Sequence, residues 1–90
     1  MIIRFEDLFL EQFNSILTYI SKDKKSAAYQ FKKSIQKKIT LLKEQPLMCR
    51  KSYYFDDKSY RDLIHQGYTV IYKVEIERIV ILEIFKWQNR

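Results

Sequence analysis

The 90-residue sequence contains only one cysteine, one histidine, one glycine and one proline. A single cysteine excludes a disulfide scaffold, and one cysteine with one histidine cannot supply the three or four nitrogen and sulfur ligands of a usual zinc site. One glycine cannot form a glycine-rich phosphate-binding loop. We therefore expect a reduced chain that holds no metal and no cofactor.

Long apolar stretches are missing as well. No run approaches the roughly 18 residues of a membrane-spanning helix, and Glu6 and Asp7 stand where a signal peptide would have its apolar segment. The sequence is nevertheless 47% hydrophobic, with seven tyrosines and six phenylalanines, which is ample core material for one domain of this length. These properties predict a single cytoplasmic globular domain over residues 1–90.

The net charge of +6 is concentrated in the middle of the chain. Residues 22–51 hold ten basic and two acidic groups, a balance of +8, whereas residues 1–21 have a balance of −2 and residues 52–90 a balance of 0. A concentrated positive field favours nucleic acid, a ribosome, an anionic lipid surface or an acidic protein as partner. A solvated, lysine-rich helix face is the alternative interpretation.

Two amphipathic helices are predicted in the first half. A short strand over residues 2–5 is followed by apolar residues at positions 9, 13, 16 and 20, whose helical spacing predicts a helix over about residues 6–20. A second apolar stripe begins at position 28 and runs to about Lys43, and Pro46 prevents its continuation. The short polar break between them predicts an αα-hairpin.

Three strands are predicted in the last third. Alternation of apolar and polar residues predicts a strand over residues 68–74. A run of β-branched and aromatic residues predicts a central strand over residues 79–87, buried on most of both faces, and residues 60–65 are expected to form the third. Gly67 lies in a two-residue gap between the first two strands and supplies the positive φ of a tight hairpin. Within the irregular connection before them, residues 53–55 could form a further short strand. The predicted fold is an α+β two-layer sandwich of order β-α-α-β-β-β. Its helical hairpin packs on an antiparallel sheet, with the first strand beside the last.

Basic and aromatic side chains on or near the predicted sheet are the candidates for binding. Arginine and lysine pair with phosphates, and tryptophan and tyrosine stack on bases. The candidates for target or nucleic-acid binding are Arg50, Lys51, Arg61, Lys73, Lys86, Trp87 and Arg90. The alternative is that the tryptophan belongs to the core and the cations to its rim. His65 titrates near neutral pH, so it is either a candidate acid or base or a solvent-facing group at a strand end.

Three segments of the second half occur in a recognisable order. An Arg-x-Leu strand at residues 60–64 precedes a Gly-Tyr turn that opens an apolar strand carrying tyrosine at 67–74, and a final apolar strand follows at 79–85. Together with the short strand and helical hairpin of the first half, they resemble the RelE/ParE toxins of bacterial type II toxin–antitoxin systems. The resemblance implies a toxin that is neutralised by, and forms a hetero-oligomer with, a cognate antitoxin whose toxin-binding part is often acidic.

The family has two main activities. RelE-like members cut messenger RNA in the ribosome, and ParE-like members poison DNA gyrase with no known catalysis of their own. The cutting members commonly carry an arginine directly after the Gly-Tyr pair, where this sequence has Thr69, and a tyrosine or histidine in or beyond the last strand. Here the tail from Lys86 to Arg90 contains neither. The resemblance therefore favours ParE-like inhibition of gyrase without catalysis.

Two other functions stay open. The first is a RelE-like, ribosome-dependent endoribonuclease, in which Arg61, Lys86 and Arg90 would contact phosphates and His65 would serve as the base. The second is a binding domain without toxicity, because one fold can carry many functions.

Overall fold

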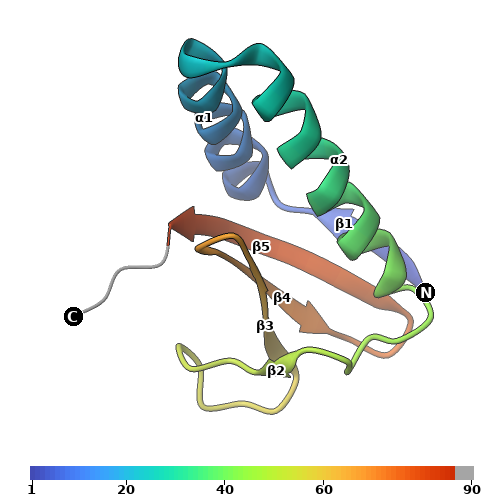
Figure 1. Ribbon diagram of the computed structural model, residues 1–90. Coiled ribbons are helices and arrows are strands. Elements are labelled where there is room, and N and C mark those ends of the chain that lie inside the picture. The colour runs from blue at the N-terminus through green and yellow to red at the C-terminus, as the bar shows by residue number, and fades with distance from the viewer. Residues whose placement is uncertain (87–90) are drawn as a thin grey trace.

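Two helices lie on one side of a five-stranded sheet in the computed structural model, which describes residues 1–86 (Figure 1). The elements, in chain order, are β1 (Ile2–Phe5), α1 (Asp7–Asp23), α2 (Lys25–Leu41), β2 (Arg50–Lys51), β3 (Tyr60–His65), β4 (Tyr68–Val74) and β5 (Arg78–Lys86). The α+β two-layer architecture predicted from the sequence is confirmed.

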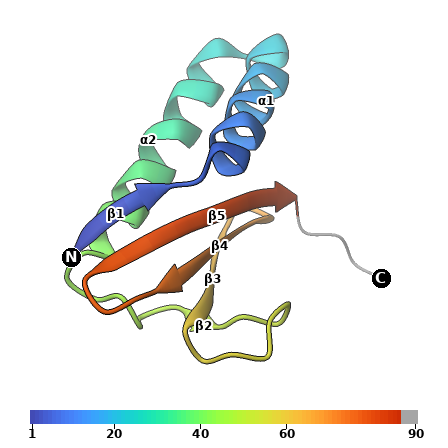
Figure 2. The ribbon, with the colours of Figure 1, turned by 180° about the vertical axis from the view of Figure 1, so that it is seen from behind.

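The strand order across the sheet is β1-β5-β4-β3-β2. Strands β3, β4 and β5 form the predicted antiparallel meander, and β1 pairs with β5 as expected. The pairing of β1 is parallel, however, with Ile3 opposite Ile79, so the sheet is mixed and not wholly antiparallel. Figure 2 shows β1 and β5 running side by side below the helical hairpin.

The helices differ from the prediction mainly at their junction. The short polar break, expected over residues 21–24, shrinks to the single residue Lys24, whose extended backbone at φ −155° and ψ 115° reverses the chain. The apolar stripes of both helices face the sheet, as their spacing predicts. The core that they form with the sheet comprises Phe9, Phe13, Phe31, Ile35, Ile39, Leu42, Leu63, Val70, Tyr72, Ile79, Ile81 and Ile84.

The turn between β3 and β4 consists of Gln66 and Gly67, as predicted. Both residues have positive φ, 49° and 83° respectively, which is the conformation of a type I′ hairpin turn. A type I′ turn matches the right-handed twist of the flanking strands, so it fixes the register that places His65 opposite Tyr68.

The connection between α2 and β3 crosses the face of the sheet that the helices leave open (Figure 1). The predicted extra strand at residues 53–55 is wrong, because the backbone N–H of Tyr53 donates to the Asp62 carboxylate and not to a strand. The short strand β2 lies just before it, with Arg50 opposite Asp62. Beyond β2, the ring of Tyr54 packs edge-on against Phe85 at 5.2 Å.

Candidate functional site

The sheet divides the predicted binding residues between its two faces. Side chains alternate along a strand, and residues paired across strands point to the same side. Arg61 pairs with Tyr72, which is in the core below the helices, so both lie on the helix face. Lys73 pairs with Tyr60 on the open face. Arg61 of β3 and Lys73 of β4 therefore point to opposite faces of the sheet.

Lys86 lies at the other end of the sheet. It pairs with Tyr68, whereas Arg61 pairs with Tyr72, four residues further along β4. At about 3.4 Å per residue this is a separation of roughly 14 Å. Trp87 and Arg90 lie outside the described residues. Within residues 1–86, the sheet brings Arg50, Lys51 and Arg61 together on β2 and β3. It sets Lys73 on the opposite face from Arg61, and Lys86 at the other end of the strands.

The two arginines nearest the connection are occupied by the protein itself. The Nε of Arg61 donates to the carbonyl of Lys58 at 3.1 Å, and its Nη1 donates to the carbonyl of Cys49 at 3.2 Å. The Nε and Nη2 of Arg50 both donate to Oδ2 of Asp62 at 3.3 Å. These contacts attach both ends of the connection to β3. Lys51, opposite Arg61, remains exposed.

His65 is buried rather than solvent-facing. It is 9% exposed, and its ring lies 5.6 Å from the ring of Phe31 on α2. Burial lowers the pKa of His65 below its ordinary value, and the positive charge of Lys38 lowers it further. His65, Tyr68 and Lys86 form one cross-strand row on the helix face. The imidazole is thus uncharged at neutral pH and packed beneath α2.

Thr69 is fully buried. It lies on the open face of the sheet, between Ile64 on β3 and Phe85 on β5. The ring of Tyr54 packs on the neighbouring Phe85. The position directly after the Gly-Tyr pair therefore has no exposed surface.

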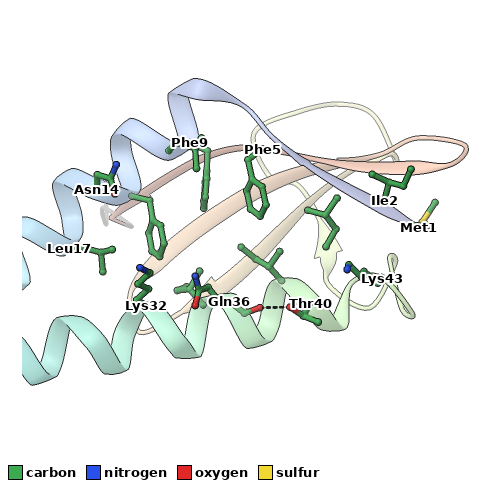
Figure 3. A pocket seen from close by; sticks show the side chains of 15 residues that line it. Met1, Ile2, Phe5, Phe9, Asn14, Leu17, Lys32, Gln36, Thr40 and Lys43 are labelled. Carbon is green, nitrogen blue, oxygen red and sulfur yellow. Dashed lines mark hydrogen bonds between the residues drawn. The ribbon is translucent and has the colours of Figure 1, made fainter.

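A groove of about 870 Å³ runs between α2 on one side and α1 with β1 on the other (Figure 3). Large apolar side chains on its walls remain partly exposed, including Phe5 at 41% and Leu10 at 44%. Lys32 and Lys43 also line it, and no aspartate or glutamate of the described residues does. The groove therefore combines an apolar floor with a positive rim.

The groove was not predicted from the sequence. Leu10 and Leu17 flank the apolar stripe of α1, and both line the groove. The only available signal was therefore an apolar arc on α1 that is wider than the sheet can cover.

Residues 1–86 contain no group of three or more histidine, cysteine or acidic residues placed to hold a metal ion. The two helices are also too short or too polar to cross a bilayer.

The helical hairpin on a mixed five-stranded sheet is the fold of the ParE/RelE toxins. A solved structure of the chromosomal ParDE TA system from P. aeruginosa has a chain with a TM-score of 0.77 to this one. The two chains are 16% identical, and the superposition covers 98% of this chain and 97% of that one. At this low identity the similarity establishes the fold.

The family follows from the sequence match. The family model described as the ParE toxin of type II toxin–antitoxin system, parDE, matches residues 3–88. This chain therefore belongs to the ParE toxin family, and the resemblance noted in the sequence is confirmed. A comparison with curated proteins finds no match.

Proposed function

We propose that this chain is the toxin of a type II toxin–antitoxin pair and that it poisons DNA gyrase through protein contact, without catalysis of its own. The observation that carries the proposal is the burial of Thr69. The position that the resemblance assigns to a catalytic arginine holds a residue with no exposed surface, so it cannot contact a phosphate.

The other groups that an RNA-cleaving site would need also support the proposal. In-line attack by a ribose hydroxyl needs a base, an acid and cations around one phosphate. His65 is packed against Phe31, Arg61 is bound to backbone carbonyls, and Lys86 lies at the opposite end of the strands from Arg61. These three groups could not surround one phosphate without unfolding part of the sheet.

Expression without any antitoxin gene tests the target. We expect growth arrest with induction of the DNA-damage response while early protein synthesis continues, because a gyrase poison leaves broken DNA. Immediate loss of protein synthesis without DNA damage would replace the proposal with the RelE-like endoribonuclease. Normal growth with verified accumulation of folded protein would replace it with a binding domain that is not toxic.

The proposal includes a cognate antitoxin that neutralises the toxin by binding in the groove. Exposed apolar side chains such as Phe5 and Leu10 are suited to the apolar face of an amphipathic segment. Lys32 and Lys43, unopposed by acids among the groove residues, are suited to carboxylates beside that face. A partner that becomes ordered on binding can cover such a long surface, and the product is a hetero-oligomer.

Co-expression with the antitoxin tests the groove. Leu10→Glu places a negative charge on the groove wall at a half-exposed position, so we expect antitoxin no longer to restore growth although toxicity persists. Ile76→Glu is the matched control, because Ile76 is an apolar residue that is 95% exposed in the turn between β4 and β5. Full rescue of the Leu10 variant would place the antitoxin elsewhere.

A further inference from the structure

Helix α2 carries a positive charge that the rest of the described chain does not neutralise. Residues 24–43 contain seven lysines and no acidic residue. The four ion pairs within residues 1–86 all involve β1 or the other strands and the turns next to them, and none involves a lysine of α2. Six of these lysines are exposed, and Lys38 is half-buried near His65.

The charge pattern opposes the stability of the helix. Lys24 and Lys25 stand at its N-terminus, where the helix dipole disfavours cations, and the first turn has neither an acidic residue nor a side-chain cap. Lys33 and Lys37 are one turn apart and repel each other by a few tenths of a kcal/mol. Since local sequence rules are usually broken at functional sites, the pattern indicates a surface selected for its charge.

The use of lysine rather than arginine on α2 indicates which class of partner this helix binds. The four arginines of the described chain, Arg4, Arg50, Arg61 and Arg78, all have protein partners. The helix uses lysine alone. Protein–protein interfaces are enriched in arginine and depleted in lysine, whereas lysine binds phosphate as a point charge with little demand on geometry. A lysine-only face is therefore better suited to a phosphate backbone than to an acidic protein surface.

We propose that the outer face of α2, which carries Lys33 and Lys37, binds the phosphate backbone of duplex DNA without reading its sequence. The lysines at 33 and 37 lie about 200° around the helix from the buried Ile35 and Ile39, so they project away from the sheet. This outer face is distinct from the groove, which is lined by Lys32 and Lys43.

The choice of duplex DNA has two grounds. Proteins that bind single strands stack successive bases on several aromatic rings, but the only exposed ring on α2 is Tyr29, and the ammonium of Lys33 lies 5.3 Å from its centre. The choice of DNA over RNA rests on the proposed function, because gyrase holds duplex DNA when it is poisoned. The lysine face would then help to hold the toxin on the gyrase–DNA complex.

Salt-dependent binding of the full chain to a fluorescent DNA duplex of random sequence tests the proposal, in the absence of gyrase. Each phosphate contact contributes about 0.9 to the slope of log K against log salt. Lys33→Gln/Lys37→Gln should therefore lower the magnitude of this slope by about 1.8. Lys22→Gln/Lys58→Gln removes the same charge from exposed positions outside α2 and should leave the slope unchanged.

Two results would overturn the proposal. One is an equal loss of slope in both double variants, which would mean that binding follows net charge alone. The other is the absence of salt-dependent binding by the unmodified chain. Circular dichroism establishes that each variant is folded, and removal of the Lys33–Lys37 repulsion should not lower its melting temperature.

A gyrase cleavage assay separates this proposal from the function on which it rests. Cleavage complexes without any DNA binding by the free chain would reject the lysine face and keep gyrase as target. DNA binding that depends on Lys33 and Lys37, with no effect on gyrase, would reject gyrase poisoning and keep the lysine face.

Discussion

Asp62 and Arg50 form an ion pair that fastens the connection between α2 and β3 to the open face of the sheet. The Asp62 side chain is fully buried, and its Oδ2 accepts hydrogen bonds from Nε and Nη2 of Arg50, both at 3.3 Å. The same oxygen accepts the backbone N–H of Tyr53 at 3.0 Å. One carboxylate oxygen thus holds both the side chain and the main chain of the segment whose Tyr54 packs on Phe85, the cross-strand neighbour of Thr69.

Asp62→Ala should strongly destabilise the fold. The substitution leaves a half-buried guanidinium and a backbone N–H without their acceptor, and loss of one partner of a buried ion pair typically costs about 3–5 kcal/mol. Urea unfolding measures the loss. The matched control is Glu75→Ala, which removes a carboxylate that pairs with Arg78 at the protein surface and should have a far smaller effect. Equal losses would contradict the role of Asp62.

His65 should make stability depend on pH. Because the pKa of folded His65 lies below its ordinary value of 6.5, the unfolded chain binds a proton first as the pH falls. The free energy of unfolding should therefore decrease below about pH 6.5 and level off once the folded state is also protonated.

Comparison with His65→Phe isolates this effect. Phenylalanine keeps an aromatic ring against Phe31 but cannot bind a proton, so the variant should lose less stability between about pH 7.5 and pH 5.5 than the unmodified chain. Lys38→Gln should raise the pKa of His65, which is measurable by NMR titration. Identical pH profiles for the unmodified chain and the phenylalanine variant would contradict the assignment.

The turn between β3 and β4 should respond in opposite directions to changes at its two residues. Gly67→Ala should destabilise the fold by roughly 1 kcal/mol, because alanine adopts a φ of 83° only with strain. Gln66→Asn should instead stabilise it slightly, since asparagine tolerates positive φ and Asn-Gly is the preferred type I′ pair. Thermal melting measures both changes, and a stabilising alanine would contradict the turn assignment.

Gln12 of α1 should be needed for the packing of the helices on β5. Its Oε1 accepts the backbone N–H of Ile84 at 2.8 Å, so Gln12→Leu leaves that N–H unsatisfied and should cost about 1–3 kcal/mol. Gln30→Leu, at an exposed position of α2, is the control and should have little effect. Equal unfolding midpoints for the two variants would show that this hydrogen bond is not needed.

The same hydrogen bond marks a limit of prediction from sequence. The β-branched and aromatic run correctly predicts β5 as a strand, but the ladder shifts by one residue between the partners of Ile71 and Tyr72. The shift brings Ile84 onto the helix face together with Ile79 and Ile81. The Gln12 side chain of α1 accepts the backbone N–H of Ile84 close to this register shift. That contact depends on how α1 packs on β5, which no local sequence pattern reveals.

Elements with a strong local signal were predictable, and positions that depend on distant contacts were not. The two helices and the Gln66-Gly67 turn follow from periodicity and from a single glycine. The 53–55 segment has the composition of a strand, but Asp62, from the neighbouring strand β3, takes the N–H that a ladder would need. The groove forms where α1, α2 and β1 meet, so its position depends on tertiary packing. The wide apolar arc of α1 was the only sequence feature that indicated an uncovered apolar surface.

The most direct test of the central claim is the incubation of the purified chain with DNA gyrase, ATP and supercoiled plasmid, followed by detergent and protease. The account predicts linear plasmid that increases with toxin concentration and disappears when antitoxin is added first. Translating ribosomes are assayed in parallel. Intact plasmid at every concentration, together with cleaved messenger RNA in the ribosome assay, would contradict it.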